Sequence, residues 1–353
     1  MLRSVRDRVA SLLHRSGAIG AVMRLRRYAP IPNLSIVTYH HIAENDADYP
    51  YDPDVSDAAP AQFRRQLELL ARYCTPIGVD ELVRSFDGEP LPENPVMVTF
   101  DDGYLSCHDT ALPILRAVGI RATFFIATGF TNDRRLYWWE RIALIINQSK
   151  RTTATIDYPE SIALDRSDKK KLHGKLTALV KNTPNLDVER FLDQLCRVLE
   201  VEWSKEIETA YANNLIMQWD HVRALARAGM DVESHGRYHR VLQTLDDAAL
   251  EDECLHSRLE LEAQLGRPVR AMAYPVGRRI AREGRIRDAL AAAGYRIGLS
   301  NKTGVNRVWP LSLRGVLPVD PFDVRRLSTD REMNDSMFIA QIAVPHLAYI
   351  DKH

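Results

Sequence analysis

Residues 96–104 read "VMVTFDDGY", a β-rich run that ends in two adjacent acids. Nearly continuous apolar and β-branched residues fit a strand that is buried on both faces of a parallel sheet. Asp-Asp-Gly is also ordinary turn chemistry, so a solvated turn is the simplest interpretation of Asp101 and Asp102. Two carboxylates repel each other unless a positive group offsets their charge, so the rest of the chain must decide between a turn and a site.

Similar runs recur along the chain, and most of them are separated by helical patterns: 34–40, 95–100, 121–127, 229–234, 269–274, 295–300 and 312–318. Gly119, Gly229, Gly266 and Gly294 stand where the intervening helices should end. Strand and helix therefore alternate about seven times, which predicts an α/β fold, either a βα barrel or an open doubly wound sheet.

Residues 137–217 break this rhythm, because they are mostly helical in pattern and contain no strand beyond a candidate at "TATIDY". We therefore predict four parts: an N-terminal helix (1–30), an α/β domain (31–136 and 218–330), a helical insertion (137–217) and a C-terminal helix or tail (331–353). The insertion is long enough to serve as a lid or a partner surface.

The composition excludes several classes. Lys and Arg total 47 and so do Asp and Glu, so no global charge indicates a nucleic-acid partner. The four cysteines are far apart and are expected to be reduced thiols. The basic N-terminus has no apolar run of signal-peptide or membrane-spanning length, which favours a cytoplasmic protein.

The N-terminal helix has one amphipathic feature. Val5, Val9, Leu12 and Leu13 share a helical stripe, with Arg3, Arg6, Arg8 and Arg15 around it. Such a helix can lie on an anionic membrane surface, here the inner one, as a peripheral contact. The alternative is a helix packed on its own domain with solvated arginines.

Chemistry in parallel α/β folds gathers at the C-terminal ends of strands. Those ends carry His40 and His41, then Asp101 and Asp102, and then "ESHGRYH", which contains His235 and His239. If the last loop makes one helical turn, the two imidazoles share a face at roughly 5–6 Å between Cβ atoms, which suits one metal ion. A pair with this spacing is common by chance, but two histidines and Asp102 would make a three-ligand site with open positions, as in catalytic metal centres.

This arrangement gives the two acids different roles. One carboxylate can bind the cation, and the cation lowers the pKa of its bound water. The other carboxylate stays free beside that water and can take its proton.

Three segments in this order, "TFDDGY" (99–104), "SHGRYH" (234–239) and "MAYPVG" (272–277), resemble the first three motifs of the polysaccharide deacetylases. That family is carbohydrate esterase family 4, also called the NodB-homology domain, and the version here resembles its exopolysaccharide- and lipopolysaccharide-associated branch. The resemblance implies a distorted (β/α)7 barrel, with 137–217 as a helical insertion. It also implies hydrolysis of an N-acetyl, O-acetyl or formyl group on a sugar with Zn2+ or another divalent cation such as Co2+ or Ni2+.

The same resemblance implies the site residues. Asp101 would be the general base; Asp102, His235 and His239 would bind the metal; and the backbone N–H of Tyr104 would help to hold the oxyanion. Two features depart from the family pattern: the third motif has no arginine, and no Leu-x-His motif supplies the general acid, since His346 in "AVPHLAY" has the wrong context. His40, at the end of the first strand, is the candidate proton source, and a histidine hydrogen-bonded inside the barrel mouth is the alternative.

The leading hypothesis is a metal-dependent deacetylase that acts on an acetylated sugar, a nucleotide sugar or a lipid-linked glycan in cell-surface polysaccharide synthesis. The alternatives are a noncatalytic sugar-binding or scaffold relative that keeps the metal site, and an O-acetyl esterase or deformylase of the same fold. A phosphoesterase is weaker, because it usually needs more carboxylates or a second metal. Trp138 and Trp139 could stack on a sugar or belong to the core, and Arg314 could face an acidic substrate or a surface ion pair.

Overall fold

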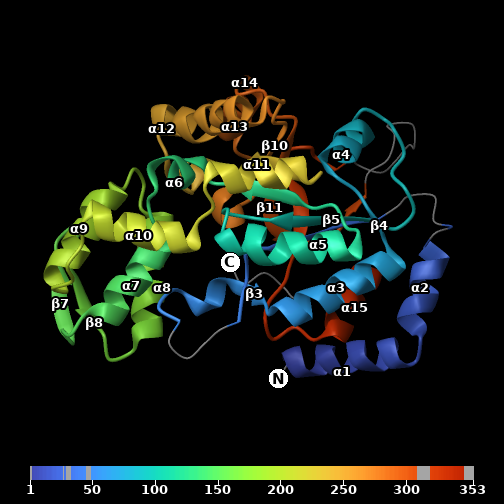
Figure 1. Ribbon diagram of the computed structural model, residues 1–353, viewed down its shortest axis with the longest axis horizontal. Helices are drawn as coiled ribbons and strands as arrows, with labels where there is room; N and C mark the ends of the chain where they lie inside the picture. Colours follow the sequence, from blue (N-terminus) through green and yellow to red (C-terminus); the bar gives the residue numbers. More distant parts are fainter. Residues whose placement is uncertain (1, 27, 29–32, 45–48, 308–318, 346–353) are drawn as a thin grey trace.

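Seven parallel strands close into a barrel that is surrounded by helices (Figure 1). The computed structural model describes residues 2–26, 28, 33–44, 49–307 and 319–345. Each strand hydrogen-bonds to the next one around the ring, and the last pairs with the first: β1 (Asn33–Tyr39), β5 (Pro95–Phe100), β6 (Thr123–Ile126), β9 (Asp231–Ser234), β10 (Ala271–Ala273), β11 (Ile297–Thr303) and β13 (Val324–Ser328). The expected distorted (β/α)7 barrel is confirmed, and the open doubly wound sheet is excluded.

The inside of the barrel is apolar at one end. Because side chains alternate across a strand, every second residue points inward. Helix α4 (Val79–Phe86) closes this end with its own apolar face. The inward-facing apolar residues are Leu34, Ile36, Met97, Phe125, Ala271, Ala273, Ile297, Leu299 and Val324. The opposite end, where the strands finish, therefore remains as the open mouth of the barrel.

Helices cover the outside of the barrel, where the other set of strand residues packs. Gly119 and Gly266 end two of them in the left-handed conformation, at φ 79° and 64°, as the sequence predicts. The covering helices are α3 (Pro60–Tyr73), α5 (Leu112–Val118), α11 (Trp219–Arg227), α12 (Asp247–Glu251), α13 (Ser257–Leu265), α14 (Gly284–Ala292) and α15 (Asp335–Ala343).

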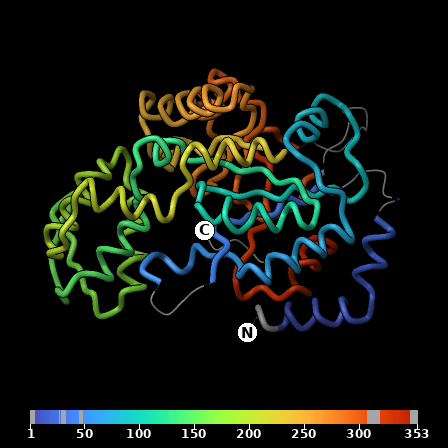
Figure 2. The backbone as a smooth tube through the Cα atoms, viewed as in Figure 1, coloured from blue at the N-terminus to red at the C-terminus, as the bar shows by residue number. Residues whose placement is uncertain are grey.

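The chain between β6 and α11 forms a separate lobe beside the barrel, on the left in Figure 2. It is mostly helical, and it also contains a small antiparallel sheet that the sequence suggested only at its first strand. The elements are α6 (Thr128–Asp133), α7 (Trp138–Gln148), β7 (Thr153–Ile156), β8 (Ile162–Asp165), α8 (Lys169–Asn182), α9 (Val188–Val198) and α10 (Lys205–Leu215).

The N-terminal part forms two helices where the sequence predicted one. Helices α1 (Leu2–Arg15) and α2 (Ala18–Arg26) are separated at Gly17, which adopts φ 78°. Helix α1 packs against α15 along the lower edge of the molecule (Figure 1). Among the described ranges, no helix combines the length and the apolar character needed to cross a bilayer.

Besides β7 and β8, four short strands of the described chain lie outside the ring: β12 (Asn306–Arg307) pairs with β1, β4 (Thr75–Pro76) pairs with β5, and β2 (His41–Ile42) pairs with β3 (Ser56–Ala58). The strand expected at 312–318, Arg314 within it and His346 lie outside the described residues. The last strand of the ring is β13, which the sequence analysis did not anticipate.

Candidate functional site

A three-residue cluster at the mouth of the barrel has the composition of a metal site. Asp102 follows β5, and His235 and His239 follow β9. The Asp102 Oδ1 atom lies 3.3 Å from His235 Nε2 and 3.5 Å from His239 Nε2, and the three ligand atoms lie within 4.8 Å of one another. Oδ1 is buried and has no hydrogen-bond partner in the described part of the chain. A buried carboxylate oxygen without a partner is costly, and a cation bound between these atoms would remove that cost.

The protonation of the two imidazoles suits a metal ligand. His235 Nδ1 lies 2.8 Å from the Ala273 carbonyl oxygen, which holds the proton on Nδ1 and leaves the Nε2 lone pair facing the cluster. Burial lowers the pKa of His239 to about 3, so its ring is neutral at physiological pH. Neutral imidazoles and an ionised carboxylate are the donor set of a Zn2+ or Ni2+ site.

The loop that carries the histidines is not the helical turn that their spacing suggested. Gly236 and His239 adopt φ 74° and 53°, which breaks any helix, yet the two histidine rings still lie 5.0 Å apart. Buried Glu253 holds the loop, since it accepts the backbone N–H of Arg237 at 2.7 Å and of Tyr238 at 2.8 Å. A Cβ at position 236 would lie 2.4 Å from Glu253 Oε2, so this position requires glycine.

Asp101 is held apart from the cluster by an arginine that the sequence analysis missed. Arg326 on β13 is fully buried, and its Nη1 donates to Asp101 Oδ1 at 2.7 Å. Burial alone would raise the pKa of Asp101, but the charge and hydrogen bond of Arg326, together with the nearby imidazoles of His235 and His40, outweigh burial and hold that pKa well below its usual range. The second oxygen, Oδ2, is buried and has no hydrogen-bond partner among the described residues. It lies 3.9 Å from His235 Nε2, so a free carboxylate oxygen faces the candidate metal site.

The turn after β5 sends the two adjacent acids in different directions. Asp101 is still part of the sheet, because its N–H donates to the Tyr39 carbonyl at 2.9 Å. Asp102 adopts φ 72°, and its own carbonyl accepts the Ala127 N–H at 3.0 Å. Non-glycine residues rarely take this conformation, and they tend to do so at functional sites.

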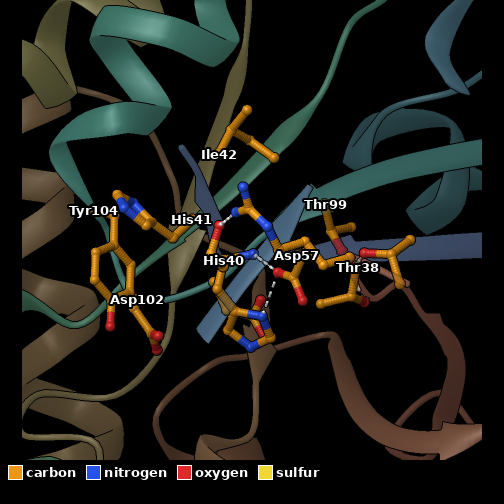
Figure 3. A network of polar contacts seen from close by, with 12 residues as sticks. Thr38, His40, His41, Ile42, Asp57, Thr99, Asp102 and Tyr104 are labelled. Carbon is orange, nitrogen blue, oxygen red and sulfur yellow. Dashed lines mark hydrogen bonds and ion pairs between the residues drawn. The ribbon is translucent and has the colours of Figure 1, made fainter. Parts of the chain in front are cut away.

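His40 faces the same mouth, while its neighbour His41 does not. His40 Nδ1 lies 3.0 Å from Asp57 Oδ2 (Figure 3). Its Nε2 lies 4.0 Å from Asp101 Oδ2. Burial lowers the pKa of His40, but the bonded Asp57 carboxylate more than offsets this effect and the pKa is raised to about 9. His41 turns away toward Ser106, whose hydroxyl lies 2.7 Å from its Nδ1. Of the adjacent residues His40 and His41, only His40 therefore faces the site.

Tyr104 joins this site to the neighbouring lobe. Its hydroxyl donates to Glu140 on α7 at 2.6 Å and accepts the Trp139 indole N–H at 2.9 Å. Glu140 also accepts the backbone N–H of Asp52 at 2.7 Å. The backbone beside Tyr104 is fixed as well, because the Gly103 carbonyl accepts the Met217 N–H at 3.0 Å. The position of the Tyr104 amide is thus fixed by the hydrogen bonds of the Tyr104 side chain to α7 and of the Gly103 carbonyl to Met217.

One cavity of about 590 Å3 at the mouth of the barrel is lined by the site residues His40, Asp57, Asp101, Asp102, His235 and His239. Helix α8 forms one wall of it with Lys170, His173, Thr177 and Lys181. Trp138 and Trp139 form another wall; both are buried, and the Trp139 ring lies 4.6 Å from that of His239. The tryptophans therefore belong to the core and also line the site.

The sequence profile of the polysaccharide deacetylase family matches residues 88–158 and 183–298. The chain belongs to the polysaccharide deacetylase family. The profile omits residues 159–182, which include β8 and α8. A comparison with curated proteins finds no sequence match. Family membership supports a hydrolase that acts on acetylated sugars.

Solved structures share the fold of this family member. The Streptococcus pyogenes deacetylase PplD in complex with acetate has a TM-score of 0.55 at 16% identity and covers 86% of this chain and 96% of its own. IcaB from Ammonifex degensii has a TM-score of 0.52 at 17% identity and covers 90% and 98%. The BpsB deacetylase domain from Bordetella bronchiseptica has a TM-score of 0.51 at 17% identity and covers 86% and 97%.

Of the predicted site residues, His40, Asp101, Asp102, His235 and His239 lie at this mouth, whereas the side chain of Tyr104 is buried and does not line the cavity. The residues that hold the site in place, which are Arg326, Asp57 and Glu253, were not predicted. The run "DVRRLS" (323–328) contained the signal for Arg326, because alternation in a β-rich run would point Arg326 into the barrel. Nothing local in the sequence marked Asp57 or Glu253.

A metal-binding measurement tests the cluster. We expect Zn2+ titrated into the metal-free protein to bind at one site in calorimetry. Asp102→Asn should lower the affinity at least about 100-fold, because it replaces a charged ligand with a neutral amide. Asp101→Asn is the matched control and should bind with wild-type stoichiometry. Equal loss of binding in both variants would contradict the assignment of only one acid to the metal.

Proposed function

We propose that this protein is a metal-dependent deacetylase that hydrolyses an N-acetyl group on a sugar used in cell-surface polysaccharide or lipid-linked glycan synthesis. One observation carries the proposal: Asp101 keeps one carboxylate oxygen on Arg326 and presents the other, unbonded, beside the Asp102–His235–His239 cluster. A protein that only binds a metal or a sugar has no use for a second, separately fixed carboxylate.

The metal ligands in this proposal are Asp102, His235 and His239. A divalent cation held there would supply an acidified water and polarise the acetyl carbonyl. The residues of the chain do the remaining work. Asp101 takes the proton of the attacking water on Oδ2, and Arg326 fixes the direction in which that oxygen points. A strong base is not needed where the water is already acidic.

The chain has no Leu-x-His motif to supply the general acid, and His40 takes that role in this proposal. With a pKa of about 9, its imidazole is protonated at neutral pH, and Nε2 carries a proton toward the cavity while Asp57 holds Nδ1. It can therefore protonate the departing amine. The backbone N–H of Tyr104 would donate to the oxyanion, an interaction whose loss typically costs roughly 3–4 kcal/mol.

The wall formed by α8 supports a substrate that carries negative charge. Lys181 lines the cavity and is partly buried, and no described carboxylate forms an ion pair with it. Burial lowers the pKa of its amine, so an anion beside it would stabilise the charged form. Arg278 lies next to it, since its guanidinium donates to the side chain of Asn182 at 2.5 Å. A phosphate that links the sugar to a nucleotide or a lipid would suit this pair of cations.

The noncatalytic alternative loses one of its two supports. It rested on the missing arginine of the third motif and on the missing Leu-x-His motif. Arg326 supplies a buried guanidinium on Asp101 from a different strand, and β10 presents only the small side chains of Ala271 and Ala273 to the same interior. The second support, the missing Leu-x-His motif, is weakened because the His40–Asp57 pair offers another proton donor.

Acetate release tests the proposed reaction. The substrates are N-acetylated nucleotide sugars, lipid-linked sugars and a neutral N-acetylated oligosaccharide, each with Zn2+, Co2+ or Ni2+ present. Asp101→Asn and His40→Gln should each lower kcat by roughly 10²–10⁴ with metal binding retained. His256→Gln, which changes an exposed histidine on the barrel surface, should leave kcat unchanged. Wild-type rates in Asp101→Asn, or activity that survives a chelator, would end the proposal.

The pH profile of kcat/KM tests the contact of Asp57 with His40 and that of Arg326 with Asp101. Wild-type kcat/KM should fall as the pH rises through about 9, where His40 loses its proton. Arg326→Met leaves the buried Asp101 without its cation, so the pKa of Asp101 rises and the acid limb should move up by at least about one pH unit. Arg325→Met removes the neighbouring arginine, which is exposed, and should not move either limb. An unchanged acid limb in Arg326→Met would refute the role of Arg326.

A further inference from the structure

Helix α1 turns an apolar stripe toward solvent. Three of the four residues predicted to share the stripe, Val5, Val9 and Leu12, are 51%, 41% and 69% exposed, whereas Leu13 packs against the core. Their spacing of four and three residues places them on one side of the helix. Amphipathic helices of globular proteins normally bury this side, so a helix that exposes it has a surface without a partner.

Exposed apolar side chains are concentrated in this part of the molecule. In the described ranges, six large hydrophobic residues are exposed, and five of them lie between positions 5 and 28: Val5, Val9, Leu12, Leu25 and Tyr28. The sixth, Leu259, is 49% exposed on α13. Single exposed hydrophobic residues are ordinary on protein surfaces, but four on two adjoining helices, with Tyr28 just after the second helix, mark an interaction surface.

Arginines border the stripe. Arg8 and Arg15 are exposed and lie four residues before and three residues after Leu12, which makes both of them its neighbours on the helix. Arg24 on α2 is exposed as well. None of the three forms an ion pair with a described carboxylate, whereas the arginines around the barrel commonly do, such as Arg223 with Asp220 and Arg285 with Asp247.

The other side of α1 is attached to the barrel domain. Ala10 is fully buried, and His14 Nδ1 lies 3.0 Å from the Ser336 hydroxyl on α15. Helix α2 is tied down by Arg26, which donates to the Ile342 carbonyl at 2.6 Å and to the Asn33 carbonyl at 3.0 Å. The stripe therefore points outward from a helix that is held in place.

We propose that α1 and α2 dock the protein on an anionic lipid surface, with the stripe among the acyl chains and Arg8, Arg15 and Arg24 at the headgroups. An apolar face bordered by exposed arginines is the pattern of helices that lie in a membrane interface. Juxtamembrane arginines gain further from the negative surface potential of anionic lipids. A symmetric dimer through the same stripe would bring the exposed arginines of two copies into one interface, and this concentration of like charge disfavours a second protein chain as the occupant. The docking does not depend on the proposed reaction.

Co-sedimentation with lipid vesicles tests the docking on the full chain. We expect the protein to sediment with vesicles of phosphatidylglycerol and phosphatidylcholine, and not with phosphatidylcholine alone. The double variant Val9→Glu and Leu12→Glu should weaken binding at least roughly tenfold, and so should Arg8→Glu with Arg15→Glu. Leu259→Glu is the matched control, since it places the same charge on a similarly exposed apolar residue elsewhere and should bind as the wild type does.

Three outcomes would overturn the docking. The wild type fails to sediment with anionic vesicles, both double variants bind as strongly as the wild type, or Leu259→Glu weakens binding as much as the double variants do. A dimer in lipid-free solution that Leu12→Glu converts to a monomer would show instead that a second copy covers the stripe. Circular dichroism and thermal melting confirm that each variant is folded. The arginine variant keeps the test decisive if the stripe variant does not fold.

Discussion

The ion pair between Arg326 and Asp101 is the contact on which the site depends. Two adjacent carboxylates buried at a barrel mouth would otherwise share a proton, because their charges repel in a medium of low dielectric. The guanidinium holds one oxygen of Asp101 at 2.7 Å, which keeps that acid ionised and directs its second oxygen toward the cluster. Asp102, rotated away by its positive φ, is left for a cation. Removing one partner of such a buried pair typically costs about 3–5 kcal/mol, so the barrel itself also depends on it.

The lobe between β6 and α11 is part of the site as well as an addition to the barrel. Glu140 on α7 binds the Tyr104 hydroxyl and the Asp52 amide, and burial raises the pKa of this acid to about 8. Trp139 on the same helix donates to the Tyr104 hydroxyl and lies against His239. A shift of α7 would therefore displace both the Tyr104 segment and the candidate metal ligand His239.

The sequence predicted the barrel, because its strands are short apolar runs with helices between them, and it predicted the site where function depends on adjacent residues, as in Asp101–Asp102. The sequence did not predict contacts between site residues and side chains that only the tertiary structure brings close. Arg326 lies 225 residues from Asp101, and no local pattern joins the two. The spacing of His235 and His239 gave their proximity but the wrong conformation, because the left-handed φ of Gly236 replaces the helical turn. Helix periodicity found the stripe of α1 but could not say that it faces solvent, since that depends on which side packs on α15.

The most direct test of the division of labour between the two acids is anomalous diffraction from crystals soaked in a Zn2+ salt. We expect one strong peak bonded to Asp102 Oδ1, His235 Nε2 and His239 Nε2, with Asp101 still paired to Arg326 and its Oδ2 unligated. A peak coordinated by Asp101, or one located away from these three residues, would contradict this division of labour.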